Sequence, residues 1–129
     1  MATDSNRFVI NKGTSNEFII KIKQNGSTMP MEISDTDTFF VKFYNLETKE
    51  LELSIDMTSG SDGQVSVYNA YNGQILIVLN DSAIADMVSE RGDKVDKYYL
   101  KPTYRMVIDC NTANNGNFTA KINSVYVQE

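Results

Sequence analysis

The sequence has few or none of the residues on which most enzyme sites depend. Its 129 residues include no histidine, no tryptophan and a single cysteine, Cys110. Without histidine, the Ser-His-Asp and Cys-His arrangements cannot form, and the commonest zinc ligand is missing. One cysteine closes no disulfide within the chain and builds no thiolate metal site. We therefore expect a protein that is not an enzyme and that uses no cofactor or metal.

Long apolar runs and basic charge are also scarce. The longest apolar run is Ile75–Leu79, whereas a membrane-spanning helix needs about twenty apolar residues. The 12 basic and 17 acidic residues give a net charge of −5, and nucleic-acid binding rests on a basic face. Residues 1–6 are polar and lack the apolar segment of a secretory signal. We expect synthesis in a cytoplasm and neither a membrane nor a nucleic acid as partner.

Short segments with a period of two recur along the chain and predict strands with one buried face. In Thr38–Tyr44, one face carries Phe39, Val41 and Phe43. The longest alternation is Tyr98–Cys110. Similar segments lie at residues 8–10, 17–23, 51–55 and 65–67. Gln74–Asn80 is apolar on both faces, which predicts a central strand covered on both sides.

Three local features modify this series of strands. Pro102 lacks a backbone donor, so it marks an edge position or a bulge. After Ile122 the apolar positions change phase, which predicts a bulge or bend before Val125 and Val127. Ala83–Ser89 has helical spacing and predicts a helix of two turns at most, with Lys94–Lys97 as a charged connection.

These elements predict an all-β fold, an antiparallel immunoglobulin-like β-sandwich of seven to eight strands with one short helix. We expect one domain over residues 1–129, which begins with a polar N-terminal arm at residues 1–6. In an assembly, this arm would be able to add a strand to a neighbour.

Motifs that carry chemistry are weak, and each has a plain structural reading. Asp35, Asp37 and Asp62 supply oxygen atoms of the kind that bind calcium, but Asp residues also cap turns. Arg91–Asp93 matches an integrin-binding tripeptide, yet Gly92 stands where a helix ends. Both motifs are better explained by local structure.

The remaining reactive and aromatic residues are also better explained by structural roles than by catalysis or glycan binding. Cys110 has the inward phase of its strand, so we expect a core residue. The carboxylates of Glu50 and Glu52 share a solvated strand face instead of flanking a cleft. The tyrosines expected to be exposed favour protein contacts over a glycan site: Tyr44, Tyr68, Tyr71 and Tyr99.

One positive hint of function points to assembly. Met29, Met31 and Met57 lie near turns, and methionine adapts well to contact surfaces. Ile19 together with Val125 and Val127 would form an exposed apolar strip, which is typical of an interface. The predicted interface residues are Phe8, Val9, Ile10, Ile19, Val125, Tyr126 and Val127.

The order of these features resembles a known viral domain. It is similar to the immunoglobulin-like domain of siphophage tail-tip and baseplate proteins, namely the N-terminal domain of upper baseplate proteins and the small tail collar proteins. The resemblance rests on pattern over nearly the whole chain, at residues 17–26, 39–44, 74–79, 83–89, 98–109 and 118–127. It implies a structural protein of the virion tail, made in the bacterial cytoplasm and arranged with other tail proteins in a ring or other homo-oligomer.

Two other functions remain open at this point. A capsid decoration protein is also a small sandwich, and it would bind heads instead of tails. A carbohydrate- or calcium-binding module would need Asp35, Asp62 or an exposed tyrosine.

Overall fold

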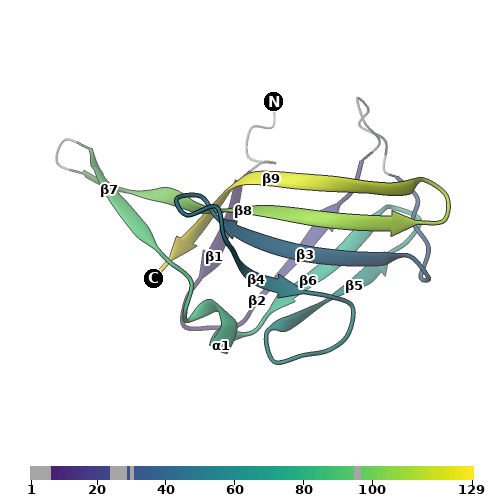
Figure 1. Ribbon diagram of the computed structural model, residues 1–129, viewed down its shortest axis with the longest axis horizontal. Helices are drawn as coiled ribbons and strands as arrows, with labels where there is room; N and C mark the ends of the chain where they lie inside the picture. The colour runs from purple at the N-terminus through teal and green to yellow at the C-terminus, as the bar shows by residue number, and fades with distance from the viewer. Residues whose placement is uncertain (1–6, 24–28, 30, 95–96) are drawn as a thin grey trace.

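The chain forms two β-sheets that face each other, with a short helix at one end (Figure 1). The computed structural model describes residues 7–23, 29, 31–94 and 97–129. The predicted arm at residues 1–6 and the Asn25–Gly26 turn lie outside this part of the chain. The described elements are β1 (Arg7–Asn11), β2 (Asn16–Lys21), β3 (Thr38–Asn45), β4 (Leu51–Ile55), β5 (Gly63–Asn69), β6 (Gln74–Leu79), α1 (Asp81–Ile84), β7 (Glu90–Lys94), β8 (Lys97–Thr112) and β9 (Gly116–Gln128).

The strand order identifies the architecture. The larger sheet runs β1-β9-β8-β3-β4, and β7 pairs with β8 outside this path. The smaller sheet runs β2-β6-β5. This arrangement corresponds to strands G-F-C-C′ facing B-E-D of a variable-type immunoglobulin domain. The predicted fold class, an immunoglobulin-like β-sandwich, is confirmed.

The core lies between the sheets and follows the predicted alternation. Phe39, Val41 and Phe43 of β3 are fully buried, as are Tyr104 and Met106 of β8. The middle strand of the smaller sheet is β6, and it has one fully buried face and one half-buried face, so the predicted central strand is present but is not covered on both sides. The buried faces of the two sheets therefore account for the strongest periodicities in the sequence.

Both predicted irregularities of the two longest strands are present. The register between β8 and β9 shifts between Pro102 and Tyr104, where proline has no donor for the ladder. A second shift puts Val125 opposite Tyr104 and Ile122 opposite Met106, so β9 carries one extra residue there. This bulge turns Val125 inward although it is out of phase with Ile122.

Two local expectations were wrong. The helix covers Asp81–Ile84 and not Ala83–Ser89, and the side chain of Asn80, which precedes it, bonds the carbonyls of Gly60 and Ser61. The chain before Lys97 is strand β7, which pairs with the start of β8, and is not only a charged connection. Its five residues include no apolar side chain and so show no alternation, and its position is given by its pairing with β8.

A buried tyrosine fastens the helix end of the sandwich to the β3–β4 hairpin. The Val88 backbone N–H donates to Tyr104 Oη at 2.8 Å, and this hydroxyl donates to Glu52 Oε1 at 2.7 Å. Asn45 Nδ2 donates to Glu52 Oε2 at 2.8 Å. A buried tyrosine bonded to upstream backbone is a hallmark of immunoglobulin-like sandwiches. Here the β7–β8 hairpin lies between the two bonded residues.

Candidate interaction site

The predicted apolar strip of Ile19, Val125 and Val127 does not, as a whole, lie exposed on the protein surface. Val125 and Val127 are 0% exposed, because β1 lies parallel to β9 and places Phe8 and Ile10 beside them in the core. The rings of Phe8 and Phe18 then cover this corner, with centroids 4.0 Å apart. Four of the seven predicted interface residues are therefore core residues: Phe8, Ile10, Val125 and Val127.

The other three predicted interface residues do reach the surface. Ile19 on β2 is 49% exposed. Val9 and Tyr126 are half-buried and pair with each other across β1 and β9. These residues remain accessible, but the structure does not bring them together with the buried valines into one strip.

A different feature, the open edge of β9, marks this side of the sandwich. β9 pairs with β8 from Gly116 to Tyr126, but with β1 only from Ser124 to Gln128. No described strand lies along the other edge of residues 116–123, which we call the open stretch. In the same way, β2 pairs only with β6 among the described strands. Such edges present backbone N–H and C=O groups without strand partners.

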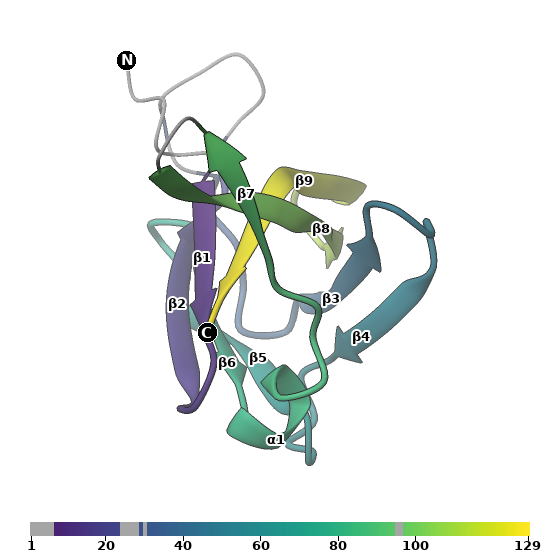
Figure 2. The same ribbon diagram turned by 90° about the vertical axis from the view of Figure 1, so that its left-hand side faces the viewer.

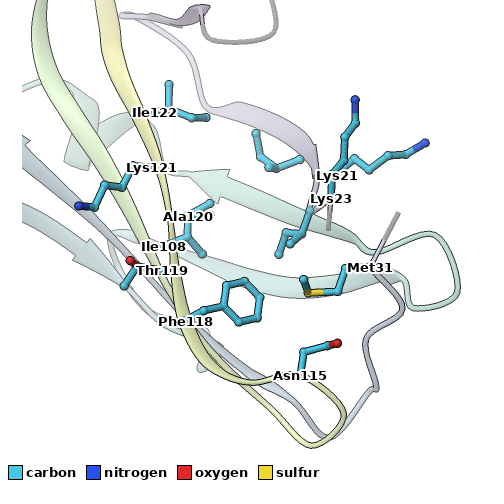
Figure 3. A pocket seen from close by; sticks show the side chains of 12 residues that line it. Lys21, Lys23, Met31, Ile108, Asn115, Phe118, Thr119, Ala120, Lys121 and Ile122 are labelled. Carbon is cyan, nitrogen blue, oxygen red and sulfur yellow. The ribbon is translucent and has the colours of Figure 1, made fainter. Parts of the chain in front are cut away.

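A groove lies between these two edges (Figure 3). Its volume is about 710 Å³, and its floor is apolar, with Phe118 and Met31 pointing toward each other from opposite sides. A neighbouring cavity of about 470 Å³ beside Phe8 and Phe18 shares Ile20 and Ile122 with it. The two together form a continuous seam along the open side of the sandwich.

The rim of the groove is positively charged. Lys21 and Lys23 stand on the β2 side, and Lys121 stands on β9 with its amine directed away from the groove floor (Figure 3). All three side chains are exposed, and none forms an ion pair with a described residue. The described lining contains no Asp or Glu. In a chain of net charge −5, this is a local excess of positive charge suited to an acidic partner.

The acidic loop residues that resemble calcium ligands have structural roles or stand apart. The carboxylate of Asp37 is buried and accepts the N–H groups of Ser34 at 2.8 Å and Ala113 at 3.0 Å. Asp35 and Asp62 are exposed. Among the described residues, no three His, Cys, Asp or Glu side chains are grouped so that they would hold a metal ion.

Cys110 is a core residue, as its phase predicted. It is 3% exposed, and burial, aided by the negative charge of Asp109, raises the pKa of its thiol to about 12. A thiol in this environment is protonated at neutral pH and is not a nucleophile. Glu52 was expected to share a solvated strand face with Glu50. Its carboxylate instead accepts hydrogen bonds from the Tyr104 hydroxyl and from Asn45 Nδ2.

The aromatic residues do not form a platform. Tyr68 and Tyr71 are exposed on β5 and the turn that follows it, in the smaller sheet. Tyr44 is half-buried on β3 of the larger sheet, under the Arg105 guanidinium at 5.6 Å. The side chains of residues 90–100, which include Tyr99 and the Arg91–Asp93 tripeptide, lie outside the part that the structure describes.

No protein family and no curated protein matches the sequence. Among solved structures, the chain is similar to the crystal structure of the ZIG-8–RIG-5 IG1–IG1 heterodimer, with 10% sequence identity and a TM-score of 0.40 over 95% of this chain and 82% of that chain. No helix in the described residues is long and apolar enough to cross a membrane.

The open stretch and its lysine rim are not evident from the sequence alone. Phe118, Ala120 and Ile122 alternate along β9, but this pattern does not indicate which strand of the fold lies beside them. The neighbour depends on the parallel register of β1 with β9, two segments more than a hundred residues apart.

Proposed function

We propose that the protein is a non-enzymatic structural component of a phage virion. It assembles in the tail tip, collar or baseplate through contacts with other tail proteins and with copies of itself, after synthesis in the bacterial cytoplasm. The phage context comes from the sequence resemblance. The observation that carries the assembly role is the open stretch of β9 above an apolar groove with a lysine rim.

An open strand edge beside an apolar groove suits a polypeptide partner in particular. An added strand bonds its backbone to the free edge, while alternate side chains fill the pocket beneath it. Soluble proteins normally blunt or cover such edges, because an uncovered edge pairs with other chains. Phe118 and Ile122 would then supply the apolar contacts, and the lysines would select an acidic strand.

Native mass spectrometry with separate tail, baseplate and head fractions tests this function. We expect discrete complexes with a tail or baseplate component. Thr119→Lys places a charged side chain on the open stretch, a device that natural edges use against pairing, and should weaken these complexes about tenfold. Thr14→Lys makes the same change at an exposed turn between β1 and β2 and should bind as the wild type does.

Two results would contradict the proposal. Absence of any complex with tail or baseplate components would remove the tail role, and binding to heads alone would favour a decoration protein. Equal weakening by Thr119→Lys and Thr14→Lys would show that the open stretch of β9 is not the contact.

A further inference from the structure

Two Asn–Gly pairs lie in described turns of the fold, and their surroundings are opposite. Asn115–Gly116 joins β8 to β9 in the hairpin turn at one end of the sandwich (Figure 1). Asn72–Gly73 lies in the turn between β5 and β6, and the pair Asn25–Gly26 lies outside the described part of the chain. In such pairs the short asparagine side chain reaches the next backbone nitrogen, and glycine has no Cβ to obstruct the approach.

The reaction open to an Asn–Gly pair needs only water. The backbone nitrogen of Gly116 gives its proton to solvent and bonds to Cγ of Asn115, and the Cγ–Nδ2 bond breaks as ammonia leaves with a proton from water. Water then opens the resulting succinimide ring. Attack at Cγ yields aspartate, and attack at the backbone carbonyl carbon yields isoaspartate, whose main chain runs through Cγ. The sum is one water consumed and one ammonia released, without oxidation or reduction.

The surroundings of Gly116 permit the rotation that ring closure requires. Asn115 and Gly116 are exposed, and a Cβ added at Gly116 meets no atom within 4 Å. Gly116 pairs with Thr112 at the last position of the β8–β9 ladder, where pairing opens most readily. Thr112 Oγ1 also accepts the Asn115 N–H and donates to the Gly116 carbonyl, so these bonds lie within the turn. Asn115 Nδ2 donates an exposed bond to the Glu32 carbonyl at 3.2 Å, and a local opening thus brings side chain and nitrogen together.

The surroundings of Gly73 oppose the same rotation. Gly73 is buried, its N–H donates to the Ala70 carbonyl at 3.2 Å, and its carbonyl accepts the Ile22 N–H at 2.8 Å. A Cβ added there would lie 2.3 Å from the Met31 carbonyl oxygen. Because β2 lies beside β6 (Figure 2), the bond to Ile22 ties this turn to the end of a neighbouring strand. Rotation of the Asn72–Gly73 peptide would therefore break tertiary contacts as well as the turn.

We propose that Asn115 is a site of spontaneous deamidation in the folded protein, whereas the fold protects Asn72. The conversion adds one negative charge to the β8–β9 turn, and the isoaspartate form also inserts a backbone methylene between the two longest strands. A virion protein is not replaced after release from the host, so both products would accumulate as the particle ages. This last consequence rests on the proposed function, whereas the conversion itself does not.

Mass spectrometry of the aged full chain tests the site. The purified protein is incubated in mildly alkaline heavy-oxygen water, so that only rings opened during incubation are labelled, and is then digested with pepsin at acid pH. We expect labelled aspartate and isoaspartate to form at residue 115 at least about fivefold faster than at residue 72, where at least one further hydrogen bond must break. Asn115→Gln should remove the product at this position and leave the rate at Asn72 unchanged, because glutamine would have to close a less favourable six-membered ring.

The same incubation in urea separates the effect of the fold from that of the sequence. In the unfolded chain, Asn72 and Asn115 should convert at similar rates, since each precedes glycine. Conversion of Asn72 as fast as Asn115 in the folded chain would overturn the inference, and so would conversion of Asn115 in urea alone. Neither result depends on whether the chain binds tail components, so the proposed function stands or falls separately.

Discussion

At the residue scale, Tyr104 connects segments that the sequence separates widely. Its hydroxyl accepts from Val88 and donates to Glu52, so one side chain links the segment after α1 to the β3–β4 hairpin. The ring is fully buried, and the loss of the hydroxyl would leave the Val88 N–H without its acceptor.

Tyr104→Phe should therefore lower the free energy of unfolding by about 1–3 kcal/mol. Urea denaturation followed by far-UV circular dichroism measures this change. Tyr68→Phe is the matched control, because Tyr68 is exposed on β5, and it should change stability by less than about 0.5 kcal/mol. If the two variants were equally stable, the hydrogen bonds of Tyr104 would contribute nothing net.

At the element scale, the β5–β6 turn supports the end of β2 and one wall of the groove. Gly73 has φ 66°, its carbonyl accepts the Ile22 N–H, and a Cβ added there would lie 2.3 Å from the Met31 carbonyl oxygen. Both the backbone conformation and the space therefore require glycine.

Gly73→Ala should cost at least about 1 kcal/mol more than Gly116→Ala. Gly116 in the β8–β9 turn has a similar φ of 73°, but a Cβ added there meets no atom within 4 Å. Gly116→Ala therefore loses stability only because alanine disfavours a positive φ, which costs about 1 kcal/mol. Thermal unfolding of both variants provides the comparison, and equal losses would mean that the carbonyl groups of Ile22 and Met31 move aside freely.

The same scale shows which elements were predictable from the sequence. β3 and the second half of β8 were predictable, because the inner face of each strand is buried and its residues alternate accordingly. The bulge in β9 was also predictable from its phase change. β7 was not predictable, because its sequence contains no apolar residue from which an alternation could be recognised. The open stretch was not predictable either, since it depends on the parallel register that places Arg7 beside Ser124.

At the scale of the whole molecule, two weak acids lie in the core between the sheets. Burial is the main cause that raises the pKa of both Tyr104 and Cys110 to about 12, from ordinary values of 10.0 and 9.0. The unfolded chain releases these protons at lower pH than the folded chain does. Each group therefore stabilises the fold fully below its ordinary pKa, and this contribution is lost as pH rises toward the folded pKa.

Stability should accordingly decline between about pH 9 and pH 12, measured as the urea midpoint at a series of pH values. Cys110→Ala should flatten the curve from about pH 9 upward, and Tyr104→Phe from about pH 10 upward. Slopes are compared instead of absolute midpoints, because both substitutions also change packing. The growing negative charge of the whole chain adds a decline of its own, but it acts equally on wild type and variants. Parallel curves for all three proteins would show that this general repulsion, and not the two buried acids, sets the alkaline limit of the fold.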